Sequence, residues 1–409
     1  MPTHQKCFVL NGYMQVFGSD CMFAAIAIVG GLLLGIFSGL LPGIHSNTVA
    51  SVLATLPIPP EALSLAIAAV VGAHLLFQFL PSIFLSIPDD TVVASVLPGH
   101  RLALSGRGRE AVSVCAFSAL ASICASVLLI PVSLVVLPAA YAMIEPQMAL
   151  VLIAASLFLL WSEREWRKIA IAAFVFLLSG ALGIATLRGA INDPLFPAFS
   201  GLFAASGILL SFTSRTRLPA QRSERTELDF LPYVAAGVCF GMLSDLLPGL
   251  AAPAQIAVFA SAAFATDDAR KFLALVSSIA ASHAVFAFSS LLSIGKAREG
   301  ALAIINGVKP VSAADLPALL GVLLLSAGIS AFLLMRLSRH ASLLSSFDTR
   351  ALNVGVLAYL VCAVAIISGG EGMLLFATAT AVGLLPPLLG IRRTHVMGLI
   401  IVPSILLAL

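Results

Sequence analysis

The residues whose chemistry stands out follow two Leu-Pro-Gly tripeptides. The first tripeptide contributes Pro42 and Gly43, and after it comes a run of one imidazole and small polar side chains: His45, Ser46, Asn47 and Thr48. Pro-Gly ends a helix, and serine, asparagine and threonine are good first residues of the next one. A helix that begins here directs free N–H groups and its positive dipole end at an anion. The run predicts an anion site, and the alternative is a capped turn that binds nothing.

The second Leu-Pro-Gly loop is chemically different, because an acid replaces a glycine. Asp245 stands where the first loop has Gly39, and alanines largely replace the polar run before Gln255. A carboxylate in so apolar a neighbourhood is costly and indicates a proton or Na⁺ site. The alternative is a helix-end aspartate at the membrane interface. Pro248, Gly249 and Gln255 are the substrate-binding candidates of this loop.

Other ionisable residues lie in or near apolar stretches. Asp89 and Asp90 follow a proline, which suits the first turn of a helix, or else they coordinate a coupling cation or the substrate. His283 lies within an apolar stretch and Lys296 in a broken one, where a cation faces a cavity or reaches back to the membrane surface. We expect His283 and Lys296 to help close the substrate site, and Asp89, Asp90 and Asp245 to couple the ion.

The composition shows which class of protein must position these residues. The chain has 409 residues, of which 60% are hydrophobic and 10% charged. Soluble domains carry about 25% charged residues, so a soluble enzyme, a disordered protein and a secreted disulfide scaffold are excluded. A net charge of +3 gives no reason to expect nucleic acid. We predict a multi-pass protein of the cell (plasma) membrane without a cleaved signal peptide.

Apolar stretches of spanning length predict an all-α integral membrane protein of about 10–12 transmembrane helices. They lie at about 22–40, 62–80, 111–138, 147–161, 168–187, 196–212, 230–247, 272–292, 316–335, 352–368, 371–389 and 394–409. Four further stretches are apolar but broken: 41–60, 81–100, 248–266 and 293–310. We expect them to be re-entrant or discontinuous helices, with Pro-kinked surface loops as the alternative.

The chain also contains an internal repeat. Residues 31–44 read GLLLGIFSGLLPGI and residues 237–250 read GVCFGMLSDLLPGL, an offset of 206 residues (249 − 43). Residues 85–99 fall opposite 292–306 with nearly the same offset. The preserved order favours a duplication over a chance likeness between two Gly/Leu-rich helices. Duplicated halves with paired broken helices are typical of secondary transporters.

The repeat predicts the organisation of the chain: a first transmembrane repeat at 1–212, a basic cytoplasmic linker at 213–229 and a second repeat at 230–409. Basic loops prefer the cytoplasm. Placing them all there requires an odd number of crossings between the two Leu-Pro-Gly loops, which makes the repeats inverted. If every broken segment re-enters and returns, the repeats are parallel. We predict the inverted arrangement.

Motifs of known enzymes are absent from the sequence. It has no Walker A run, HExxH, GxSxG or dinucleotide fingerprint, and no CxxC or CxxH spacing that would indicate a metal site. We predict no catalytic residues, no enzymatic activity and no cofactor, apart from Na⁺ or H⁺ as a coupling ion. An intramembrane enzyme that pairs His45 with Asp245 is the least favoured alternative.

Residues 31–57, GLLLGIFSGLLPGIHSNTVASVLATLP, resemble the signature of the large membrane subunit of tripartite tricarboxylate transporters, the TctA family. The resemblance extends over IPDDTVVASVLPGHRLALSGRGREAV, FPAFSGLFAASGILLSF and GLLPPLLGIRRTHVMGLIIVPSILL. It covers nearly the whole chain and is closest to the shorter, archaeal-type branch of the family.

The resemblance implies a secondary carrier for a small organic anion, a di- or tricarboxylate, driven by an ion gradient and working by alternating access. In the three-component systems an extracytoplasmic binding protein delivers the substrate and a small membrane subunit assists, so both are implied partners. The Gly-x-x-x-Gly-Leu-Leu-Pro-Gly motif is also similar to that of polyprenyl-phosphate translocases, which makes a lipid phosphate the alternative substrate. The oligomeric state is left open, a homodimer included.

Overall fold

The structure of the chain is a bundle of helices. The computed structural model describes residues 3–41, 44–85, 93–189, 191, 193–212, 218–222, 227–247, 256–257, 259–260, 264, 266–340 and 349–409. Within these ranges the backbone is almost entirely helical and forms no strand, which confirms the predicted all-α class. There, eight helical stretches are long and apolar enough to cross a membrane, and three shorter apolar ones accompany them.

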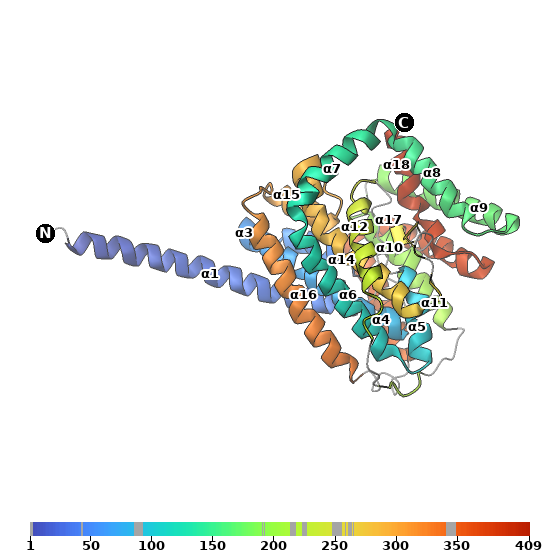
Figure 1. The fold of residues 1–409 in the computed structure, drawn as a ribbon, viewed down its shortest axis with the longest axis horizontal. Helices are drawn as coiled ribbons and strands as arrows, with labels where there is room; N and C mark the ends of the chain where they lie inside the picture. Colours follow the sequence, from blue (N-terminus) through green and yellow to red (C-terminus); the bar gives the residue numbers. More distant parts are fainter. Residues whose placement is uncertain are drawn as a thin grey trace.

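One group of helices, here named the core group, shares a hydrophobic core. It consists of α1 (Thr3–Leu40), α2 (Ser46–Ala54), α3 (Pro60–Phe77), α4 (Phe79–Leu85), α5 (Val93–Leu104), α6 (Gly108–Leu128), α7 (Ile130–Ile144), α12 (Leu231–Ser244), α14 (Ala269–Ile294), α15 (Gly300–Val308) and α16 (Leu316–Ser338). In Figure 1 the first part of α1 projects from the bundle.

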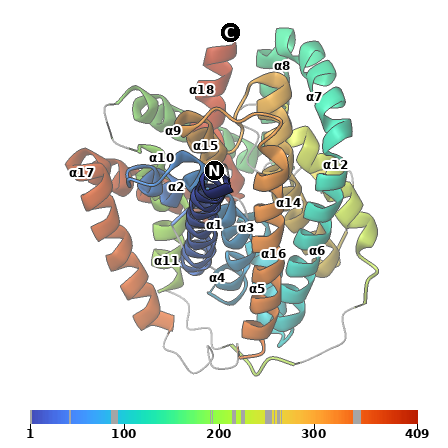
Figure 2. The ribbon, with the colours of Figure 1, turned by 90° about the vertical axis from the view of Figure 1, so that its left-hand side faces the viewer.

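A second group, here named the flanking group, has hydrophobic cores of its own. It consists of η1 (Glu145–Gln147), α8 (Met148–Trp161), α9 (Trp166–Arg188), α10 (Leu195–Phe199), η2 (Ser200–Ala205), α11 (Ser206–Ser211), α17 (Thr349–Leu389), η4 (Arg393–Met397) and α18 (Gly398–Ala408). Figure 2 shows α10, α11 and α17 on one side of α1, with α14, α16 and α6 on the other. Each group therefore takes helices from both predicted repeats.

Of two helix breaks, one differs from the prediction and one agrees with it. The predicted span 111–138 is divided at Leu129, where α6 ends and α7 begins. Pro131 has no N–H to donate to the preceding turn, which weakens the helix there and suits the first turn of a new helix. In α17 the break lies at Gly369, whose φ of 67° is a left-handed conformation that glycine adopts without penalty. That position separates the predicted stretches 352–368 and 371–389.

In the first half, α1 and α3 pack closely because glycines leave room between them. A Cβ on Gly31 would overlap the Ala66 carbonyl, and one on Gly35 would overlap the Val70 carbonyl. Residue numbers rise together along both helices, so the helices are parallel. The helical stretch Pro60–Leu85 continues beyond the end of α1. The end of α1 therefore lies within the bundle.

In the second half, α12 and α14 make matching contacts. Gly237 faces Leu275 of α14, and Gly241 faces Ile279 one turn later. These helices are also parallel, and α12 also ends beside the interior of its longer neighbour. The glycine contacts of the two pairs are alike, and the duplication itself stays a prediction.

The two helix pairs run in opposite directions. Glu61, at the start of α3, lies 3.5 Å from Lys309, which follows α14 and α15. At the other end of this helical stretch, the Ile83 carbonyl in α4 lies 3.0 Å from a ring nitrogen of α5. Helix α5 packs against the first turns of α14, where Gly99 faces Leu273. The direction from α3 to α4 is therefore opposite to that of α14.

The described part of the predicted linker is attached to the turn between α5 and α6. The Gln221 side chain accepts a hydrogen bond from the Gly108 N–H (2.8 Å) and donates one to the Ala103 carbonyl (3.0 Å). The Arg222 N–H donates to the Gly106 carbonyl (2.7 Å). Two basic segments that were predicted to face the same side of the membrane are therefore in contact.

Candidate functional site

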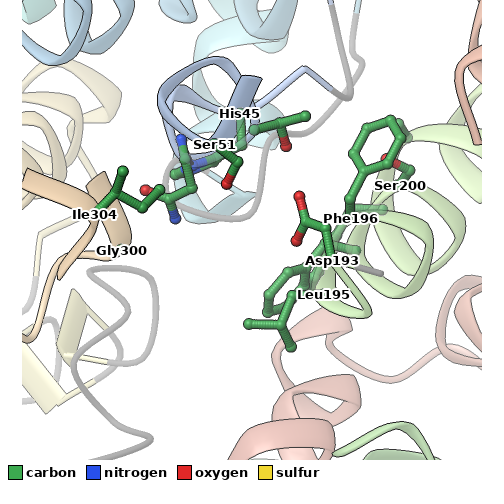
Figure 3. Close-up of a pocket in the computed structure, with 13 residues that line it drawn as sticks. His45, Ser51, Asp193, Leu195, Phe196, Ser200, Gly300 and Ile304 are labelled. Carbon is green, nitrogen blue, oxygen red and sulfur yellow. Dashed lines mark hydrogen bonds between the residues drawn. The ribbon is translucent and has the colours of Figure 1, made fainter. Parts of the chain in front are cut away.

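A cavity of about 200 Å³ lies between the core group and the flanking group. The core group contributes residues at the start of α2 and α15: His45, Asn47, Thr48, Ser51, Gly300 and Ile304. The flanking group contributes the connection before α10 and the helices after it: Asp193, Leu195, Phe196, Phe199, Ser200, Phe203 and Ala204. Figure 3 shows the two walls facing one another. The cavity is thus polar on the side of α2 and largely aromatic on the other, except for Asp193 and Ser200.

The core-group wall is organised by the first turn of α2. His45 is the N-cap residue, and its Nδ1 accepts the Asn47 N–H at 3.3 Å. The Ser46 hydroxyl lies 3.3 Å from the same nitrogen, and Ser46 is buried beside His45. An N-cap side chain satisfies amide groups that have no partner within the helix. The predicted helix start after the first Leu-Pro-Gly therefore exists, with the imidazole as its cap.

Asn47 joins the two predicted repeats at the cavity. Its Oδ1 accepts the backbone N–H of Ala301 at 2.8 Å, in the first turn of α15. Gly300 makes this approach feasible, since a Cβ there would lie only 2.7 Å from the Asn47 side chain. Two helix N-termini, one from each repeat, consequently meet at this wall of the cavity. Their dipoles add positive potential where an anion would bind.

Replacing Asn47 by alanine is expected to destabilise the protein by about 1 kcal/mol, the usual cost of losing a helix cap. Asn47→Asp retains an oxygen that accepts the Ala301 N–H and is the matched control. Thermal unfolding of the purified protein measures both. Equal melting temperatures for Asn47→Ala and the wild type would show that this bond does not hold α15 in place.

Asp193 is a cavity residue that our reading of the sequence missed. It lies between α9 and α10, and Figure 3 shows its carboxylate directed into the cavity. Its φ is 45°, a left-handed conformation that aspartate tolerates better than most residues. Burial raises the pKa of Asp193 above its usual value, and the Phe196 amide and His45 partly offset this effect. An acid next to a proline between two apolar stretches was the available signal.

The helix beyond Asp193 has an unusual backbone. Residues Ser200–Ala205 form a π-helix, a rare conformation that often marks functional sites. Ser200 and Phe203 from this segment line the cavity. Gly201 and Gly383 let the segment pack directly on α17, since a Cβ at either position would meet backbone of the other helix. The cavity wall is therefore held by the flanking group.

Asp245 and His283 form a separate buried site in the second half. His283 Nδ1 lies 3.3 Å from Asp245 Oδ1 and 3.0 Å from the Ser244 hydroxyl. Arg298 Nε donates to the Asp245 carbonyl at 3.0 Å and neutralises the negative end of α12. Arg298 also lies over the Tyr141 ring, 5.8 Å from its centroid. Neither Asp245 nor His283 lines the cavity described above.

The first half contains the counterpart of this histidine. His74 Nδ1 lies 3.0 Å from the Ser38 hydroxyl, as His283 does from Ser244. Gly39 occupies the position of Asp245. The His45 ring is a titratable neighbour of His74, with 5.4 Å between the two ring centroids. The two halves thus share a Ser–His pair but carry different ionisable neighbours.

The structure brings only some of the predicted site residues together. His45, Asn47 and Thr48 line the cavity, and Ser46 lies against it. Lys296 is exposed just after α14, with its N–H 3.5 Å from the Ser290 carbonyl. Seven predicted residues lie outside the described residues: Pro42, Gly43, Asp89, Asp90, Pro248, Gly249 and Gln255. Substrate and ion binding by any of these residues stays a prediction.

The described residues offer no group of three or more His, Cys, Asp or Glu side chains that could hold a metal ion. The catalytic pairing of His45 with Asp245 gains no support, because Asp245 contacts His283 whereas His45 caps α2.

Comparison with known proteins agrees with this architecture. Residues 25–398 match the family described as the tripartite tricarboxylate transporter TctA family. The chain is 27% identical over 406 residues to an uncharacterized protein of Methanocaldococcus jannaschii, a match that covers 94% of this chain and 99% of the relative. No solved structure matches it. The family match confirms the resemblance inferred from the motifs, and the archaeal relative fits the shorter branch.

Proposed function

We propose, from the premise that the chain belongs to the tripartite tricarboxylate transporter TctA family, that it carries a di- or tricarboxylate across the membrane by ion-coupled alternating access. Membership makes it a multi-pass permease of a transporter family. The substrate class, the coupling and the mechanism are the proposal. The family match gives no support to a polyprenyl phosphate as the alternative substrate.

The cavity between the helix groups is the observation that carries this proposal. Two helix N-termini meet at its polar wall, and the hydroxyls of Thr48, Ser51 and Ser200 line it. Such an environment favours carboxylate oxygens. Drug-sized ligands occupy pockets of about 300–1,000 Å³. A cavity of about 200 Å³ therefore suits a smaller, compact anion.

The helix arrangement supports alternating access. The helix pairs α1/α3 and α12/α14 make matching contacts and run in opposite directions, as inverted repeats would. The substrate cavity lies at the boundary of two helix groups with separate cores. In secondary transporters of this kind, one bundle moves against the other around a central site. We propose that the flanking and core groups move in this way.

The ion and the partners complete the proposal. Na⁺ or H⁺ is the coupling ion, and Asp245 is the one of the three acids predicted from the sequence to couple it that lies within the described residues. A small membrane subunit and an extracytoplasmic binding protein are the expected partners, and the plasma membrane is the expected location.

Ligand-dependent thermal stabilisation of the purified protein tests this proposal. Citrate, succinate and a polyprenyl phosphate are compared with and without Na⁺ and across pH. A ligand at about 100 times its dissociation constant should stabilise the protein by roughly 2.7 kcal/mol. We expect a carboxylate to do so and Thr48→Val to weaken the response. Stabilisation by the lipid phosphate alone would overturn the proposed substrate class.

A further inference from the structure

The cavity contains a charge that a carboxylate carrier has to neutralise. Asp193 and His45 are the titratable residues among those that line it, and they belong to opposite walls. The Asp193 carboxylate is half-buried and directed into the space where the substrate would lie. A carboxylate substrate and an ionised Asp193 would repel one another in so small a volume. A cation or a proton at Asp193 would remove this repulsion.

The cavity that Asp193 lines also contains hydroxyl-bearing side chains. The hydroxyl of Ser200 lies on the same wall, and those of Thr48 and Ser51 lie on the wall across from it. Oxygen ligands are those that hard cations prefer. Asp245, by contrast, already contacts His283 within the core group and does not line the cavity. A cation at Asp245 would not touch the substrate.

We propose that Asp193 binds the coupling cation, Na⁺ or a proton, next to the carboxylate substrate at the boundary between the two helix groups. This inference rests on the proposed function and assigns its coupling site. The cation neutralises the carboxylate that repels the anion, and the anion in turn attracts the cation, so their binding is mutually favourable and the coupling is reciprocal. Because Asp193 is held by the flanking group and α2 by the core group, the filled site also joins the two groups across the cavity.

The test compares Asp193→Asn with the wild type in proteoliposomes that contain the full chain and radiolabelled citrate. Two modes are measured: citrate accumulation driven by a Na⁺ gradient or by a pH gradient, and citrate counterflow without any ion gradient. The wild type is expected to perform both, and the more effective gradient identifies the cation. Asp193→Asn is expected to retain counterflow and to lose accumulation. Accumulation by Asp193→Asn at the wild-type level would overturn the proposal.

Binding measurements give an independent readout. The coupling cation is expected to raise the citrate affinity of the wild type by about 5–150-fold, and that of Asp193→Asn by no more than about twofold. Asp315→Asn, which removes an acid outside the cavity, is the matched control and should behave as the wild type. If Asp193→Asn fails to fold, Asp193→Glu replaces it in the test. This variant keeps the charge but displaces it, so its affinity for the cation is expected to differ from that of the wild type. An unchanged cation affinity would overturn the proposal.

Failure of the carboxylate hypothesis is distinguishable from failure of this inference. If citrate neither binds nor moves in the wild type, thermal unfolding in NaCl is compared with choline chloride, and across pH. Stabilisation by Na⁺ or by protons that disappears in Asp193→Asn would uphold the cation site while the substrate class falls. Identical cation dependence in both proteins would overturn the site itself.

Discussion

Replacing Gly31 by alanine is expected to lower the free energy of unfolding by about 1–3 kcal/mol, the usual cost of overpacking a close contact. The added Cβ would overlap the carbonyl of Ala66, and the neighbouring atoms within 3.0 Å are also backbone atoms of that residue. A backbone cannot rotate away as the end of a flexible side chain can, so α1 and α3 must separate. Thermal unfolding of the purified protein measures the loss.

The adjacent residue is a matched control for this prediction. A Cβ on Gly30 would meet no atom within 4 Å. Gly30→Ala should therefore be neutral, or stabilising by up to about 1 kcal/mol, because alanine loses less backbone entropy in a helix than glycine does. Gly237→Ala, at the matching position of α12, should behave as Gly31→Ala. Equal melting temperatures for Gly30→Ala and Gly31→Ala would contradict the close packing of α1 on α3.

His283→Leu is expected to destabilise the protein by about 3–5 kcal/mol, because it leaves a buried carboxylate without its partner. Asp245 is fully buried, and its described neighbours offer it no hydrogen bond that would compensate for the loss of the imidazole. Asp245→Ala should cost less, since a histidine left alone can become neutral by releasing a proton. The double variant should recover part of the loss. Chemical unfolding of all three variants measures the coupling between the two side chains.

The pair itself supplies the control for this second prediction. In the Asp245→Ala background, His283→Leu removes the same ring without leaving the Asp245 carboxylate behind. Its cost there should be clearly smaller than that of His283→Leu in the wild type. If the substitution costs the same in both backgrounds, the carboxylate contributes nothing and the prediction fails.

Several features of the candidate site were accessible from local sequence. A polar run directly after Pro-Gly predicted a helix start, and His45, Asn47 and Thr48 do line the cavity there. The acid Asp245 stood out because its neighbourhood is apolar. That it contacts His283 could not be read from the chain, since the contact depends on how α12 packs against α14. Asp193 was missed because a single acid before a proline is ordinary in a surface turn.

The sequence by itself determined the class of protein and the approximate ends of its membrane helices. A bilayer demands about 20 consecutive apolar residues for each crossing and leaves backbone groups no partner other than the helix itself, so hydropathy alone carries that information. Only the tertiary structure decided which polar residues share a cavity. Asp193 and His45 are far apart in the chain and line one cavity because the two helix groups pack against each other. Such packing is a property of whole surfaces, which no short stretch of sequence contains.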